Sequence, residues 1–180
     1  GAGTLHVSTT GVDSPACGAQ SDPCRNIDYA ANKAATGDWI KVAGGTYFFA
    51  NVINDCAGVT PPSVVCVVNK SITIRGGYSS TTWAFDSIAN PTVIDGQNTY
   101  RGAYVYSPGS AFCPACPSSV RLTLADMTIQ NGRAADGGGI LVDGGLRAAA
   151  AVTLESVRLQ DNQALGASSV SGPGGDARGS

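Results

Sequence analysis

The chain has 180 residues, which is enough for one domain with its own hydrophobic core and too few to require two. Charged residues make up only 13% of it, and the formal net charge is −2 with no basic run, so nucleic acid and anionic membrane surfaces are poor partner candidates. No apolar segment approaches the roughly 20 residues of a membrane span. Glu155 is the only glutamate, and a bias toward aspartate favours turns over helices, so the composition indicates an all-β, turn-rich protein.

The N-terminal part is predicted to hold one strand, one loop and one helix. Residues 4–8 alternate and predict a strand, and residues 11–24 read as a loop. A helix is predicted over 26–36, with Asn26 capping its start and Gly37 ending it in the left-handed conformation. Its apolar residues follow the i, i+3, i+4, i+7, i+8 pattern of one buried face: Ile27, Ala30, Ala31, Ala34 and Ala35. A second strand is predicted directly after it, at 39–42.

Short β segments then recur without helices between them. They are predicted at 64–68, 71–74, 92–94, 103–106 and 140–142. The sequences that separate them, such as 76–78, 95–98 and 143–145, are rich in Gly, Asp and Asn and are typical of turns.

An internal repeat organises the second half of the chain. Residues 122–131 align with residues 152–161 without a gap, at an offset of 152 − 122 = 30 positions, and four apolar positions coincide. The apolar spacing within each copy is two, three and two, which predicts a strand, a one-residue corner and a second strand. Three short strands per roughly 30 residues predict a solenoid whose coils stack about 4.8 Å apart, with Leu122 under Val152 and Ile129 under Leu159. An antiparallel β-sandwich with a chance repeat is the alternative.

The six cysteines form three close pairs in the sequence. They are Cys17 with Cys24, Cys56 with Cys66, and Cys113 with Cys116. Six cysteines allow 15 pairings, and local pairing is the simplest because each pair brackets a Pro- or Gly-rich stretch. We expect structural disulfides and hence a secreted, extracellular protein that begins near its mature N-terminus. A metal site at the Cys-x-x-Cys sequence is the competing interpretation, but it lacks a second ligand pair.

Several segments resemble the right-handed parallel β-helix superfamily named after pectin lyase, and more narrowly the bacterial surface β-helix proteins of the adhesin type. These segments are residues 23–27, 37–47, 74–78, 93–96, 124–132 and 137–140. The resemblance covers most of residues 4–165. It implies one right-handed parallel β-helix (solenoid) domain over 1–165, with the N-terminal α-helix at 26–36 capping the first coil. Residues 166–180 are expected to be a Gly/Ser-rich tail or the start of a further coil.

Enzymes of this superfamily act on acidic polysaccharides and use clustered carboxylates. This chain has no Asp-Asp pair, and in the repeat Asp126 aligns with Ser156 and Ala125 with Glu155, so no acidic column is complete. Asp95, in an Asp-Gly sequence, is interpreted as a turn residue. We therefore expect no catalytic residues, no cofactor and no metal. A Ca²⁺ site using the turn residues Asp136, Asp143 and Asp161 is the alternative.

The expected function is a non-catalytic extracellular structural module at the cell surface, an adhesin or a fibre subunit. No apolar strand follows Asp161 in the sequence, so the last coil is expected to be open and to assemble head-to-tail with neighbouring subunits, or to continue in a longer protein. Trp83 and Tyr100, in predicted loops, are candidates for a surface contact. A polysaccharide-binding or polysaccharide-cleaving (lyase or hydrolase) β-helix protein is the alternative.

Overall fold

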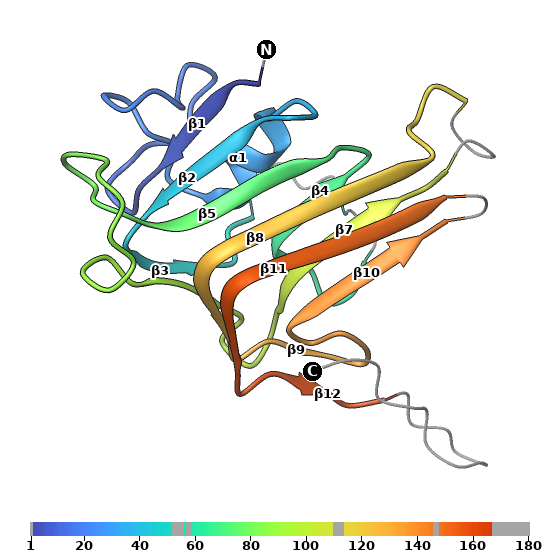
Figure 1. Cartoon of the computed structure of the whole chain (residues 1–180). Coiled ribbons are helices and arrows are strands. Elements are labelled where there is room, and N and C mark those ends of the chain that lie inside the picture. Colours follow the sequence, from blue (N-terminus) through green and yellow to red (C-terminus); the bar gives the residue numbers. More distant parts are fainter. Residues whose placement is uncertain (1, 52–55, 57–58, 110–113, 146–147, 167–180) are drawn as a thin grey trace, which may run out of the picture.

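The fold is built almost entirely from parallel β-strands. The computed structural model describes residues 2–51, 56, 59–109, 114–145 and 148–166. Within them, every pairing between named strands is parallel, and the one helix is short. These pairings exclude the antiparallel sandwich. The protein is therefore all-β, with one sheet that curls like half a barrel (Figure 1).

Three sheets contain all the named strands. The curled sheet has seven strands, namely β1 (Thr4–Val7), β2 (Trp39–Ala43), β3 (Gly45–Phe48), β5 (Ile72–Tyr78), β6 (Thr92–Asp95), β8 (Ser119–Gln130) and β11 (Ala149–Gln160). A three-stranded sheet contains β4 (Ser63–Val68), β7 (Arg101–Ser107) and β10 (Ile140–Gly144). A small third sheet pairs β9 (Arg133–Ala134) with β12 (Gln163–Ala164).

The curl of the large sheet comes from a bend inside β8 and β11. Asp126 and Ser156 lie at equivalent points of these strands and have φ angles of 53° and 52°. This left-handed conformation costs energy for any residue with a Cβ, and short polar side chains adopt it most readily. Before the bend β8 pairs with β5, and after it β8 pairs with β6. We call the two halves of the bent strands the first arm and the second arm.

The chain visits these surfaces in a fixed order. It passes through the first arm, the second arm and the three-stranded sheet as β2, β3 and β4, and again as β5, β6 and β7. It then follows β8 through both arms and continues through β9 to β10. We call each such pass a rung, and β11 with β12 forms the last described rung. The main apolar core lies between the curled sheet and the three-stranded sheet.

The thirty-residue repeat is the spacing between two adjacent rungs. Leu122 pairs with Val152 and Ile129 with Leu159, so the predicted stacking of these residues is confirmed. The register holds from Ala149 opposite Ser119 to Gln160 opposite Gln130, across the bend. Residues that lie 30 positions apart in the repeat are therefore direct neighbours on adjacent strands.

The helix α1 (Ile27–Lys33) is shorter than the predicted 26–36. Ala34 already has extended backbone angles, so Ala35 lies outside the helix and is exposed. Gly37 has a φ of 94° as expected, but three residues separate it from the end of the helix. Asn26 is the N-cap residue, yet its side chain makes no cap hydrogen bond and donates to Asp13 instead. The predicted extent and side-chain cap of this helix were therefore wrong.

Two disulfides join cysteines that are close in the sequence. Cys17 bonds Cys24 and Cys56 bonds Cys66, which are the local pairings. Cys116 is also disulfide-bonded, whereas Cys113, its expected partner, lies outside the described residues.

Candidate functional site

The last rung leaves its inward-facing apolar side chains partly uncovered. In β8, the side chains of Leu124 and Ile129 are fully buried. Their partners one rung on, Leu154 and Leu159 in β11, are 43% and 41% exposed. β8 is covered on both sides by paired strands, whereas among the described residues only β8 pairs with β11. The difference in exposure therefore arises from the missing neighbour and not from the residue types.

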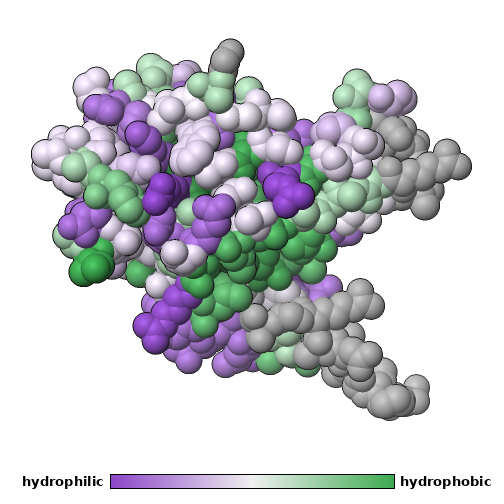
Figure 2. All heavy atoms as spheres, viewed as in Figure 1, coloured by the Kyte–Doolittle hydropathy of each residue, from purple (hydrophilic) through white to green (hydrophobic). Residues whose placement is uncertain are grey.

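Other apolar side chains extend this surface around the same end of the stack. Val142 in β10 is 42% exposed and Leu165, just after β12, is 55% exposed. Figure 2 shows apolar side chains gathered across the middle of the view, where β10 and β11 lie in Figure 1. We call the surface formed by Val142, Leu154, Leu159 and Leu165 the open end.

Polar links between rungs continue up to the open end. Asn162 follows the last residues of β11, and its side-chain amide donates to the Ile129 carbonyl at 2.9 Å and accepts from the Gly132 amide at 2.8 Å. A second left-handed corner precedes it, with φ angles of 52° at Asn131 and 53° at Asp161. The last rung thus repeats the corner geometry of the rung beneath it.

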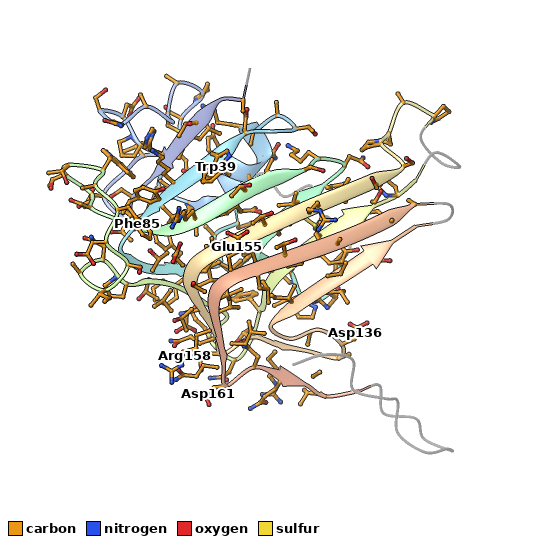
Figure 3. All side chains as sticks on the ribbon, viewed as in Figure 1. Trp39, Phe85, Asp136, Glu155, Arg158 and Asp161 are labelled. Atoms are coloured by element: carbon orange, nitrogen blue, oxygen red, sulfur yellow. A yellow bond between two sulfur atoms is a disulfide. The ribbon has the colours of Figure 1, made fainter. Side chains whose placement is uncertain are left out.

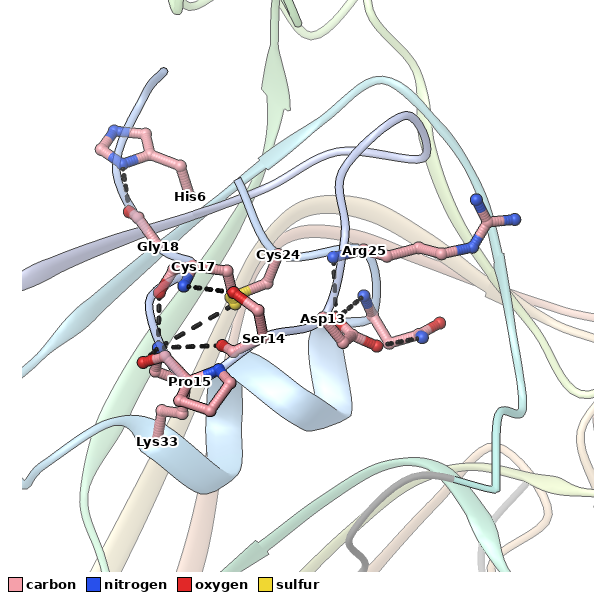
Figure 4. The surroundings of a disulfide bond; sticks show 10 residues. His6, Asp13, Ser14, Pro15, Cys17, Gly18, Cys24, Arg25 and Lys33 are labelled. Carbon is pink, nitrogen blue, oxygen red and sulfur yellow. Dashed lines mark hydrogen bonds between the residues drawn. A yellow bond between two sulfur atoms is a disulfide. The ribbon is translucent and has the colours of Figure 1, made fainter. Parts of the chain in front are cut away.

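The opposite end of the stack is closed. The outer edge of β1 is hydrogen bonded to the disulfide loop, through the His6 amide to the Gly18 carbonyl, the Cys24 amide to the His6 carbonyl and the Ser8 amide to the Cys24 carbonyl, each at 2.9 Å. Lys33 at the end of α1 donates to the Cys17 carbonyl and so ties the helix to the loop (Figure 4). Within the described residues the two ends therefore differ, because one is covered by its own chain and the other presents an apolar surface.

His6 is buried where the disulfide loop covers the edge of β1, a region that we call the N-terminal cap. Its Nδ1 lies 2.9 Å from the Gly18 carbonyl oxygen, and its Nε2 is buried without a hydrogen-bond partner. The ring meets Trp83 edge to face at 4.6 Å between centroids. Burial lowers the pKa of His6, the Gly18 carbonyl partly opposes this effect, and the positive charge of Lys41 lowers the pKa further. The surroundings of His6 in the N-terminal cap therefore favour its neutral form.

The two aromatic residues predicted for a surface contact both lie against other side chains. Trp83 is only 7% exposed and its indole N–H donates to the Gln20 carbonyl, so its ring lacks the free face that a contact needs. Tyr100 stacks on Phe49 at 4.3 Å between centroids and is half-buried. Among the described residues, the exposed large aromatic side chains are instead Trp39, Phe48 and Phe85, two of which are labelled in Figure 3.

Two acidic residues of the curled sheet, Asp95 and Asp126, are each used for hydrogen bonds or an ion pair. Burial by itself would raise the pKa of Asp95, but hydrogen bonds from the Gln130 side chain, the Gln97 amide and the Asn131 side chain outweigh it and lower the pKa. Asp126 pairs with Arg75 at 2.6 Å. Each of these two carboxylates is therefore held in a structural bond.

The three aspartates considered for Ca²⁺ do not come together. Asp136 accepts from the buried Arg101, Asp143 accepts from the Tyr104 hydroxyl, and Asp161 accepts from Gln160. Asp136 and Asp161 are labelled in Figure 3. In the part of the chain that the structure describes, the one group of three potential metal ligands is Asp13 with Cys17 and Cys24, and those two sulfurs are bonded to each other.

An open last coil is expected from the sequence, but which side chains it exposes follows from strand order, as Leu154 and Leu159 show. The sequence carries no signal for Arg101, an almost fully buried cation held by the carbonyls of Pro61, Asp136 and Gly137. Among the described residues, no helix has the length and apolar character needed to cross a membrane. Comparisons with protein-family models, with curated proteins and with solved structures find no match for this chain.

Proposed function

We propose that this protein is a non-catalytic extracellular structural module, a surface scaffold of the adhesin or fibre-subunit kind, which assembles through its open end. In this proposal the rungs are coils of a right-handed parallel β-helix like that of the pectin lyase superfamily. The fixed order of the strands and the single-step register of the repeat support it. Disulfides are typical of proteins from oxidising compartments, which supports an extracellular location.

The observation that carries the proposal is the difference between the two ends of the stack. The edge of β1 is closed by the loop from Gly18 to Cys24, whereas β11 exposes both an unshared edge, within the described residues, and the side chains of Leu154 and Leu159. An uncovered strand edge beside apolar surface favours pairing with further β-structure. A structural module that pairs with further β-structure at one end needs one covered edge and one uncovered edge.

Electron microscopy and light scattering of the purified chain test the proposal. We expect assemblies that grow with protein concentration and that Leu154→Glu reduces, because a charge at an inward-facing position opposes burial of the open end. Thr153→Glu is the matched control, because Thr153 is the neighbouring residue of the same strand and points to the other face. A monodisperse monomer at all concentrations, or equal assembly by both variants, would contradict the proposal.

A polysaccharide-binding role is favoured by a different surface, the outer face of the curled sheet. Trp39 is 40% exposed, and it pairs in register with Thr73, which is followed by Thr123 and Thr153 in the next strands. A half-exposed indole beside a row of hydroxyl groups suits stacking against a sugar ring. A shallow groove beside it is lined by Asp38, Thr73, Arg121 and Thr123, among others.

Titration with neutral and acidic oligosaccharides, followed by isothermal titration calorimetry, tests this second function. Trp39→Ala is expected to abolish binding, and Phe48→Ala, which removes another exposed aromatic ring of the curled sheet, is expected to leave it unchanged. If no oligosaccharide binds the unaltered chain with measurable heat, the second function is excluded.

A further inference from the structure

We propose that the open end binds a strand segment that runs parallel to β11 and repeats the side-chain pattern of β8 and β11. This inference rests on the proposed function and names the partner for the same surface. The residues of β8 and β11 define what the partner strand must contain, because β11 would pair with it in the way that β8 already pairs with β11.

The first requirement on the partner is its apolar pattern. β11 covers the buried column of β8 with Ala150, Val152 and Leu154 in the first arm and Val157 and Leu159 in the second. These are alternate positions within each arm, interrupted by the corner. A partner that buries Leu154 and Leu159 as completely as β11 buries Leu124 and Ile129 needs apolar residues at the same five positions.

The second requirement is a corner that follows the bend of β11. The bend requires a left-handed residue, and the two rungs that show it use Asp126 and Ser156. A straight partner strand can pair with only one arm of β11. The partner therefore needs Asn, Asp, Ser or Gly at this position, since residues with branched or bulky side chains rarely adopt the conformation.

A third feature, an amide side chain after the second corner, would strengthen the contact but is not required, because the aligned position in the rung of β8 is Gly132. Asn162 bonds both the Ile129 carbonyl and the Gly132 amide of the rung beneath it. The equivalent groups of the last rung are the Leu159 carbonyl and the Asn162 amide, one repeat later. An asparagine at the corresponding position of the partner would make the same two bonds and fix its register.

The parallel direction separates this partner from the two ways in which a second copy could bind. The N-terminal edge of another copy is occupied, because the loop from Gly18 to Cys24 already bonds to β1. Two copies of the purified chain, which lacks this partner, can meet through their β11 strands about a two-fold axis and so give the Leu154-dependent assembly expected above, but that pairing is antiparallel. All pairings between named strands in the described residues are parallel, and the β8–β11 interface is the one that the partner extends.

The experiment uses the full chain and a synthetic peptide with the sequence of residues 149–164, which carries every required feature. Binding is followed by fluorescence anisotropy of a dye on the peptide. We expect saturable binding, and at least roughly tenfold weaker binding when the two leucines of the peptide are replaced by serine, because two leucines, each buried as far as Leu154 and Leu159 are in β11, are together worth more than one factor of ten in affinity. Leu154→Asp in the protein is expected to weaken binding to a similar extent, and Thr153→Asp is not.

The direction of the bound peptide is tested with a spin label at its N-terminus. A parallel peptide broadens the NMR signals of the Ala149 and Ala150 amides, whereas an antiparallel one broadens that of Gln160. This readout does not depend on any variant folding correctly. Absence of binding, equal binding by the serine peptide, or an antiparallel peptide would overturn the inference.

Failure of the inference can be told apart from failure of the proposed function. If assembly depends on Leu154 but the peptide does not bind, the proposed function stands and the proposed partner is refuted. A chain that binds the peptide in parallel but whose assembly is unaffected by Leu154→Glu supports the partner and refutes the assembly role.

Discussion

Asn162 joins two rungs through both polar atoms of its side chain. Replacing it by alanine, Asn162→Ala, removes the bonds to the Ile129 carbonyl and the Gly132 amide and leaves both backbone groups without these partners. We expect the free energy of unfolding to fall by about 1–3 kcal/mol. Urea denaturation measures it. Gln160→Ala is the control, because Gln160 is exposed and its side chain bonds only the exposed Asp161, and a loss of similar size there would contradict the linking role of Asn162.

His6 predicts a dependence of stability on pH. Because burial lowers its pKa in the folded protein below the ordinary 6.5, the unfolded chain takes up the proton first as the pH falls. The stabilising contribution is therefore complete above pH 6.5 and is lost as the pH falls through the lower, folded pKa. Denaturation at pH 7.5 and at about 5.5 measures this loss in the unaltered chain. In His6→Gln the loss should be smaller, and equal losses in both proteins would show that other groups cause the effect.

Single residues were predictable where a pattern repeats and unpredictable where contacts join distant segments. The pairing of Leu122 with Val152 follows from a fixed offset, so the sequence alone identifies it. Trp83 sat in a predicted loop, yet its contacts with His6 and Gln20 span more than 60 positions and bury it. Whether a loop side chain is exposed depends on which other loop folds over it, and local spacing carries no information about that.

At the scale of whole elements, β8 and β11 provide a matched comparison of a covered strand and an uncovered one. Leu124 and Leu154 occupy equivalent positions, but Leu124 is fully buried and Leu154 is 43% exposed. We expect Leu124→Ala to cost about 2–5 kcal/mol and Leu154→Ala to cost clearly less, because less apolar surface is lost and no closed cavity forms. Thermal or urea unfolding of the two variants measures the difference. Equal costs would mean that the open end is covered in solution.

The elements show the same division between local and distant information. The spacing of two, three and two correctly placed a corner between two strand segments, because alternation within a strand and its interruption are local properties. The helix was predicted too long because the alanines continue the helical spacing to Ala35. Its end at Lys33 is accompanied by bonds from that side chain to the disulfide loop, and by a bond from the Ala35 amide to Asp38. The Lys33 bonds join segments 16 and 18 positions apart, so the helical spacing does not contain them, whereas the Asp38 bond is a local turn that the alanine spacing does not reveal.

For the molecule as a whole, stability should vary along the stack, because the strands of each rung pair only with strands of adjacent rungs and the two ends are closed differently. A rung with one neighbour opens at a lower cost than a rung with two. The β1 edge has a substitute neighbour in the loop from Gly18 to Cys24, whereas β11 has none among the described residues. Opening is therefore expected to begin at β11.

Native-state hydrogen exchange measures this gradient directly. We expect amides of β11 to exchange at least about tenfold faster than the aligned amides of β8, since a difference of 1.4 kcal/mol in opening free energy already gives that factor. The amide of His6, bonded to Gly18, should remain protected until the Cys17–Cys24 disulfide is reduced. Reduction should then speed exchange in β1 and leave β8 unchanged, because two intervening strands, β2 and β5, separate them. Uniform protection from β1 to β11 would show that the stack opens as one cooperative unit, and the difference between its ends would then have no energetic consequence.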